Sequence, residues 1–293
     1  MKKLVLGCFF LLIFMSCEKT IKIKTNATSP KLVVDAQIEN DLPPRVILST
    51  SIGYYDTIDS TILTNSFIHD ATVTISDGSK TYLLKEFKIS AAKGFVYFYS
   101  SDPSVSSTYL TGAFGKSYQL KVTYLNQVYS ATTGIPDLTK KIDSIWWKPL
   151  KNYPDSPQVV IMATVSDPPG LGNYIRYFTQ QNSRPFFPGF NSVFDDQIVD
   201  GKTYSIQIDK GVDRNQKIDR ASYGFFLKGD TATIKLCDID KATYDFWRTW
   251  EYAFQSIGNP FSSPGKVIGN IDNGALGAFC GYAAQYKTLI IPK

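Results

Sequence analysis

Apolar and polar residues alternate along many short stretches of this chain, a pattern that predicts half-buried β-strands. The clearest stretch is 71–76 (ATVTIS), which stops at Asp77-Gly78, a dipeptide typical of tight hairpin turns. About seven such strands, separated by turn residues, predict an immunoglobulin-like β-sandwich over residues 30–135. These strands are expected at 32–38, 45–49, 71–76, 82–87, 94–99, 118–124 and 126–132.

A second β-rich domain is predicted over residues 140–293, after a linker at Gly134-Ile135-Pro136-Asp137. Residues 241–256 interrupt its strands, because Asp240 is a good helix cap and aromatic residues recur behind it at helical spacing. We therefore predict a mainly all-β fold with one helix near 241–256. Its aromatic face is expected to pack in the core rather than to form a cofactor box, and it consists of Phe246, Trp247, Trp250 and Phe254.

The first residues have the features of an export signal. Lys2 and Lys3 precede an apolar run that ends at Met15 and is too short to span a bilayer permanently. Ser16 and Cys17 follow, and a small residue before a cysteine is the pattern of a lipoprotein signal that is cut before the lipidated cysteine. We predict a signal peptide over 1–16, lipidation at Cys17 and a polar tether over 17–29. The alternative is an ordinary secretory signal with an incidental cysteine.

The amino-acid composition indicates the class of protein and limits the partners that it can bind. With 43% hydrophobic and only 19% charged residues, the chain is globular rather than disordered, and its 18 Tyr and 19 Phe favour β structure. Loss of Lys2 and Lys3 with the signal leaves 29 basic and 26 acidic residues. This net charge of 29 − 26 = +3 is too small to indicate nucleic-acid binding. Cys237 and Cys280 would form one disulfide in an exported protein, or remain two separate buried thiols.

Few residues offer catalytic chemistry. His69 is the one histidine of the chain, and we interpret it as a surface residue, which disfavours sites that need a histidine base. No metal site and no cofactor are predicted. Hydrolysis of glycans by a pair of carboxylates remains an alternative function. The densest acidic group is Asp195, Asp196 and Asp200, for which solvated loop charges are the simpler interpretation.

The most apolar loop is predicted at 184–190, where three phenylalanines and two prolines fall together. If this loop is exposed, it is a partner or ligand contact, since contiguous apolar surface is otherwise avoided. The alternative is that its rings fill the core of the second domain. The residues concerned are Phe186, Phe187, Phe190 and Phe194.

Short motifs in a fixed order run through nearly the whole mature chain. They are CEK (17–19), PKLVV (30–34), ATV (71–73), GKSY (115–118), IP (135–136), IDS (142–144), DP (167–168), NY (173–174), GNPF (258–261), NI (270–271) and GAF (277–279). In this order they resemble the Bacteroidota outer-membrane lipoproteins grouped as a domain of unknown function, number 4249. The resemblance implies an immunoglobulin-like domain, a β-rich C-terminal domain and frequent association with TonB-dependent receptors. It implies no catalytic residues.

The expected function is that of a non-catalytic binding or accessory lipoprotein, held on the outer membrane by its N-terminal lipid. Its expected partner is a TonB-dependent β-barrel receptor, in nutrient uptake or envelope assembly. Whether it faces the cell surface or the periplasm is left open. The alternatives are a carboxylate-based glycan hydrolase and a structural or adhesive surface lipoprotein.

Overall fold

The computed structural model describes residues 29–53, 59–91, 94–219, 222–259 and 265–293. The predicted signal peptide, the lipidation candidate Cys17 and nearly all of the predicted tether lie outside the described residues. Strands dominate the rest, accompanied by one long helix, α3 (Lys241–Ser256), so the prediction of a mainly β fold is confirmed. Within the described residues, no helix has the length and apolar character needed to cross a bilayer.

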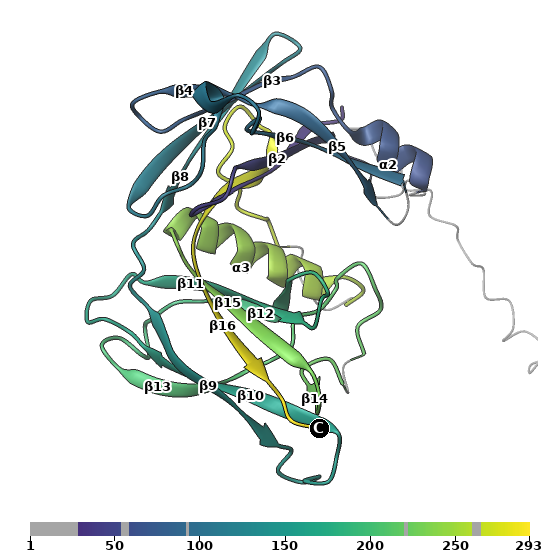
Figure 1. Ribbon diagram of the computed structural model, residues 1–293. Helices are drawn as coiled ribbons and strands as arrows, with labels where there is room; N and C mark the ends of the chain where they lie inside the picture. Colours follow the sequence, from purple (N-terminus) through teal and green to yellow (C-terminus); the bar gives the residue numbers. More distant parts are fainter. Residues whose placement is uncertain (1–28, 54–58, 92–93, 220–221, 260–264) are drawn as a thin grey trace, which may run out of the picture.

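One eight-stranded sheet joins the two halves of the chain (Figure 1). Its central strand, β16 (Leu276–Ile290), pairs in parallel with β1 (Leu32–Glu39) and, further along, antiparallel with β15 (Thr231–Ile239). The first and last strands of the described chain therefore lie side by side. The other strands of this sheet are β12 (Phe187–Phe194) and β11 (Tyr174–Gln181) beyond β15, and β2 (Arg45–Thr50), β6 (Gly94–Ser100) and β5 (Lys85–Ala91) beyond β1.

A four-stranded sheet packs against the β1 half of the large sheet and completes a sandwich. Alternate residues of β1 and of β7 (Lys116–Tyr124) are buried between the two sheets, as the period of two in their sequences requires. Val34, Leu48, Val73, Leu120 and Phe279 are among the core residues they share. The strands of the smaller sheet are β4 (Thr81–Leu83), β3 (Thr72–Ser76), β7 (Lys116–Tyr124) and β8 (Gln127–Ile135), and the short helices α2 (Ser60–Ser66) and η2 (Ser106–Thr108) lie in connections.

The β15 half of the large sheet is covered on both faces. One face packs on a third sheet around a core that includes Val159, Ile161, Phe226 and Ile234. Helix α3 covers the other face, where Tyr244 and Phe246 pack against strand residues (Figure 1). The third sheet consists of β9 (Lys141–Pro149), β10 (Gln158–Ser166), β13 (Thr203–Ile208) and β14 (Phe226–Leu227).

Helix α3 is placed by its cap. The side chain of Asp240 accepts the N–H of Thr243 at 2.7 Å, which satisfies a free donor in the first turn. Its second oxygen accepts the N–H of Gly134 at 2.8 Å and the hydroxyl of Thr133 at 3.0 Å. One carboxylate therefore starts the helix and ties it to the end of β8.

Candidate functional site

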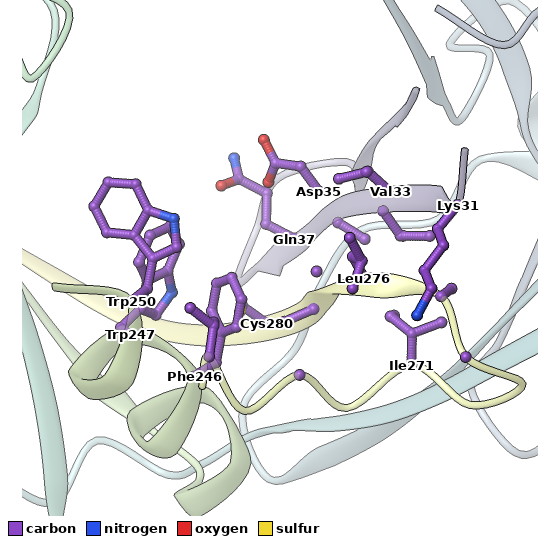
Figure 2. A pocket seen from close by; sticks show the side chains of 18 of the residues that line it. Lys31, Val33, Asp35, Gln37, Phe246, Trp247, Trp250, Ile271, Leu276 and Cys280 are labelled. Carbon is purple, nitrogen blue, oxygen red and sulfur yellow. The ribbon is translucent and has the colours of Figure 1, made fainter. Parts of the chain in front are cut away.

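A pocket of about 820 Å³ lies between helix α3, the paired strands β1 and β16, and the segment 266–276 (Figure 2). Val33, Asp35 and Gln37 of β1 point into it, because the alternate residues of that strand face the sandwich core. We call this cavity the helix–sheet pocket. The pairing of β1 with β16 creates it, so residues from both ends of the chain are needed to form it.

An ordered aromatic wall closes the helix side of the pocket. Trp247 donates its indole N–H to the hydroxyl of Tyr282 at 2.8 Å, and the guanidinium carbon of Arg176 lies 3.4 Å from a Trp247 ring centroid. Trp250 packs edge-on against Trp247 and stacks on Phe254 with an interplanar angle of 7°. These contacts hold the rings in place without a ligand, so little conformational entropy is lost when one binds.

Small residues of β16 keep the opposite side of the pocket open. Gly277 has a φ of +97°, and a Cβ at this position would lie 2.0 Å from the carbonyl oxygen of Val34. Glycine therefore lets the two strands approach closely. Ala278 and Cys280 continue this face. Burial raises the pKa of the Cys280 thiol to about 12, so at neutral pH the thiol is protonated and acts as a small apolar group.

A few polar groups complete the lining. Asp35 is exposed and Gln37 is half-buried on the β1 side, and Lys31 and Lys266 are exposed residues at other points of the lining. The pocket thus combines a large aromatic and aliphatic surface with a small number of hydrogen-bonding groups, as small-molecule sites do. The sequence predicts Trp247 and Trp250 as core residues. In the structure Phe246 is buried, but both tryptophans are half-buried and line the pocket.

The four phenylalanines do not form one surface. The prediction of a loop over 184–190 is wrong from Phe187 onward, because edge strand β12 begins there and pairs with β11. An edge strand tolerates Pro188, and Gly189 lets the strand pass over Tyr177. Phe190 and Phe194 line one cavity of about 500 Å³, where they pack on Tyr223 and Tyr177, whereas Phe186 packs on Tyr286 and Phe187 lines another cavity. Their role as a partner contact stays a prediction.

The three acidic residues singled out from the sequence do not converge on one cavity. Asp195 accepts the hydroxyl of Tyr244 at 3.0 Å and lines that same cavity of about 500 Å³, whereas Asp196 and Asp200 do not line it. Asp196 accepts the N–H groups of Gly172 and Asn173, each at 2.9 Å, and Asp200 accepts that of Gly170 at 2.6 Å. Asp196 and Asp200 therefore hold the turn after β10.

We expect Asp196→Asn to lower the free energy of unfolding by about 1–3 kcal/mol near pH 7, since an amide nitrogen would face backbone donors. Burial by itself raises the pKa of Asp196, but the N–H groups of Asn173 and Gly172 outweigh it and hold this pKa below its usual value. The stabilisation is therefore complete above about pH 4 and is lost as the pH falls through the folded-state pKa.

Urea denaturation near pH 7 and at progressively lower pH measures this effect. The difference between wild type and Asp196→Asn is expected to shrink as the pH falls. Asp155→Asn, at an exposed position, is the matched control and is expected to unfold as wild type does. Equal midpoints for Asp196→Asn and wild type near pH 7 would contradict the assigned role.

The two cysteines in the described part of the chain are separate buried thiols. Cys237 and Cys280 are both free and buried, and the register of the sheet explains why. Cys237 lies opposite Ala284, four positions further along β16 than Cys280, so the two sulfur atoms do not meet. The disulfide is therefore not formed, and the alternative of two buried thiols holds.

A family model described as "Domain of unknown function (DUF4249)" matches residues 18–288 of the 293-residue chain. The chain belongs to the DUF4249 family. A search of curated proteins found no match. The family description carries no activity, so the function of this DUF4249 protein has to be argued from its pocket and its surfaces.

Proposed function

We propose that this protein is a non-catalytic binding protein that holds a small organic molecule in the helix–sheet pocket. The observation that carries the proposal is the pocket itself. Its volume of about 820 Å³ is of the size that small-molecule sites have, and its aromatic wall is already ordered. Preorganised aromatic surface contributes binding energy at little entropic cost.

The lining indicates the chemistry of the ligand. Trp247 and Trp250 offer surface for a ring or acyl body, and Gln37 offers both a donor and an acceptor for a polar end. The ammonium groups of Lys31 and Lys266 suit an anionic substituent. We therefore propose an amphipathic molecule with an apolar or ring-containing body and a polar or anionic end.

The ionisable groups of the described lining residues favour binding over catalysis. They provide a single carboxylate, Asp35, so they do not provide the carboxylate pair of a glycan hydrolase. The thiol of Cys280 is protonated at neutral pH. The hydroxyl of Tyr282 has a raised pKa because it is buried, and it is engaged by Trp247 and Arg176.

We propose further that Cys17 carries a lipid anchor in the outer membrane and that a TonB-dependent receptor is the partner, in nutrient uptake or envelope assembly. The support is the short apolar run ending in a small residue and Cys17, together with the resemblance to outer-membrane lipoproteins. Acyl chains contribute about 0.8 kcal/mol per buried methylene, so a multiply acylated cysteine holds a protein on a membrane.

The proposed lipid anchor and receptor partner are tested by affinity purification. The tagged full-length protein is purified in mild detergent from its native outer membrane. Mass spectrometry is expected to find acyl chains on Cys17 and a β-barrel receptor in stoichiometric amount. Cys17→Ser is expected to leave the membrane fraction and to lose the receptor. A protein that purifies alone would argue against the partner, and a membrane-bound Cys17→Ser would argue against the anchor.

A further inference from the structure

Lys140 is a fully buried lysine in contact with a fully buried aspartate. Its Nζ lies 2.8 Å from Oδ1 of Asp167, and both side chains are 0% exposed. Despite this distance, the pair lacks the angles of a hydrogen bond, and neither atom has another hydrogen-bond partner among the described residues. The nitrogen is thus held against the carboxyl group without being directed at an oxygen lone pair.

The sheet places the two side chains opposite each other. Lys140 directly precedes β9 and Asp167 directly follows β10, and Lys141 pairs with Ser166 in the ladder between them. The backbone of Lys140 is fixed by hydrogen bonds to Asp238 and Gln285, and that of Asp167 donates to the carbonyl of Lys202. Both side chains are therefore brought together by secondary structure rather than by chance contact of flexible groups.

Further polar groups surround the pair. The N–H of Gly201 donates to Oδ2 of Asp167 at 3.2 Å, which draws electron density away from its carboxyl carbon. One carboxylate oxygen each of Asp167, Asp196 and Asp200 lie within 4.8 Å of one another. Asp238 accepts the backbone N–H of Lys140 through Oδ1, while its buried Oδ2 has no hydrogen-bond partner in the described chain.

We propose that Lys140 and Asp167 form an intramolecular isopeptide bond. The ammonium group of Lys140 first gives up one proton, and the lone pair of the neutral Nζ then attacks Cγ of Asp167. A C–N bond forms, the bond from Cγ to one carboxyl oxygen breaks, and that oxygen leaves as water. The ammonium group supplies both protons that this water needs, and the carboxylate of Asp238 carries a proton from the nitrogen toward the leaving oxygen. The products are one amide and one water, so the step requires no oxidant, reductant or co-reactant.

Three physical arguments favour the amide over a lasting ion pair. A buried ion pair whose charged groups share no hydrogen bond with each other carries a desolvation penalty that the neutral amide avoids. Fixed groups in van der Waals contact react with the effective concentration of an intramolecular reaction. Burial also raises the pKa of Asp238 to about 6, although hydrogen bonds from the backbone of Lys140 and from Thr139, and the charge of Lys140, lower it. This carboxyl therefore exchanges protons near neutral pH.

The intact mass of the purified, folded protein tests the proposal. Wild type is expected to be lighter than its processed sequence by the mass of one water molecule. Tryptic digestion with tandem mass spectrometry is expected to find the peptide containing Lys140 joined to the peptide containing Asp167. A wild-type protein with the full sequence mass overturns the proposal, and this measurement needs no variant to fold.

Variants assign the bond to these residues. Lys140→Arg keeps the positive charge but is expected to show the full mass, whereas Lys141→Arg, the neighbouring exposed lysine, is expected to keep the loss of water. Asp238→Asn is expected to leave the reaction incomplete after a time at which it is complete in wild type. Loss of water in Lys140→Arg would overturn the assignment, and an unchanged rate in Asp238→Asn would overturn the role of Asp238.

Discussion

Trp250→Ala is expected to weaken ligand binding in the helix–sheet pocket by about 10- to 100-fold, which corresponds to about 1.4–3 kcal/mol. The indole of Trp250 forms part of the pocket wall (Figure 2). It also stacks on Phe254, with ring centroids 5.4 Å apart. Alanine removes this surface and leaves Phe254 without its stacking partner. The probe is anilinonaphthalene sulfonate, whose rings and anionic group match the lining, and the measurement is a fluorescence titration.

Trp146→Ala is the matched control for this titration. Trp146 lies on β9, is also half-buried, and does not line the pocket. Its variant is expected to bind the dye as wild type does. Dye binding of equal affinity by Trp250→Ala and wild type would show that the dye, and by extension this class of ligand, does not use the pocket.

Arg214→Ala is expected to lower the free energy of unfolding by about 3–5 kcal/mol, because it leaves a buried carboxylate without its cation. Arg214 donates from Nη2 to Oε1 of Glu251 at 2.7 Å, and the two side chains are 9% and 5% exposed. The same nitrogen donates to the carbonyl of Gly189, so the guanidinium joins helix α3 to strand β12. Its carbon also lies 5.0 Å from the centroid of the Trp250 ring.

Urea denaturation measures this loss. The control is Arg248→Ala, at an exposed arginine of helix α3, the helix that carries Glu251. It is expected to change the free energy of unfolding by less than about 0.5 kcal/mol. The double variant Arg214→Ala/Glu251→Ala is expected to lose less free energy of unfolding than the sum of the losses in the two single variants. The reason is that Glu251→Ala removes the carboxylate that Arg214→Ala leaves without a cation. If Arg214→Ala unfolds at the wild-type urea concentration, the ion pair does not support this part of the fold.

Local patterns of the sequence predicted the local structure well. Alternation over 71–76 and a turn at Asp77-Gly78 correspond to strand β3 and its hairpin with β4, because a half-buried strand needs a period of two. The helix near 241–256 is α3, capped by Asp240 as expected. In both cases the deciding contacts lie within a few residues, so the sequence pattern contains them.

Predictions about exposure and contact were less successful. The phenylalanines and prolines at 184–190 predict that Phe187 lies in an apolar loop. Pairing with β11 instead makes Phe187 the first residue of an edge strand. Trp247 and Trp250 have the spacing of core residues and pack against the core, yet both stay half-buried and line the pocket. Nothing local in the sequence marks Lys140 as buried, because its burial depends on Asp167 and on elements far along the chain.

The sequence by itself determined the mainly β fold class, the capped helix and the family to which the chain belongs, since each follows from short patterns and their order. Only the tertiary structure decided which segments meet. The pairing of β1 with β16 joins residues more than 230 positions apart and creates the helix–sheet pocket. Such pairing depends on the summed burial of many side chains. No single stretch of sequence contains that information.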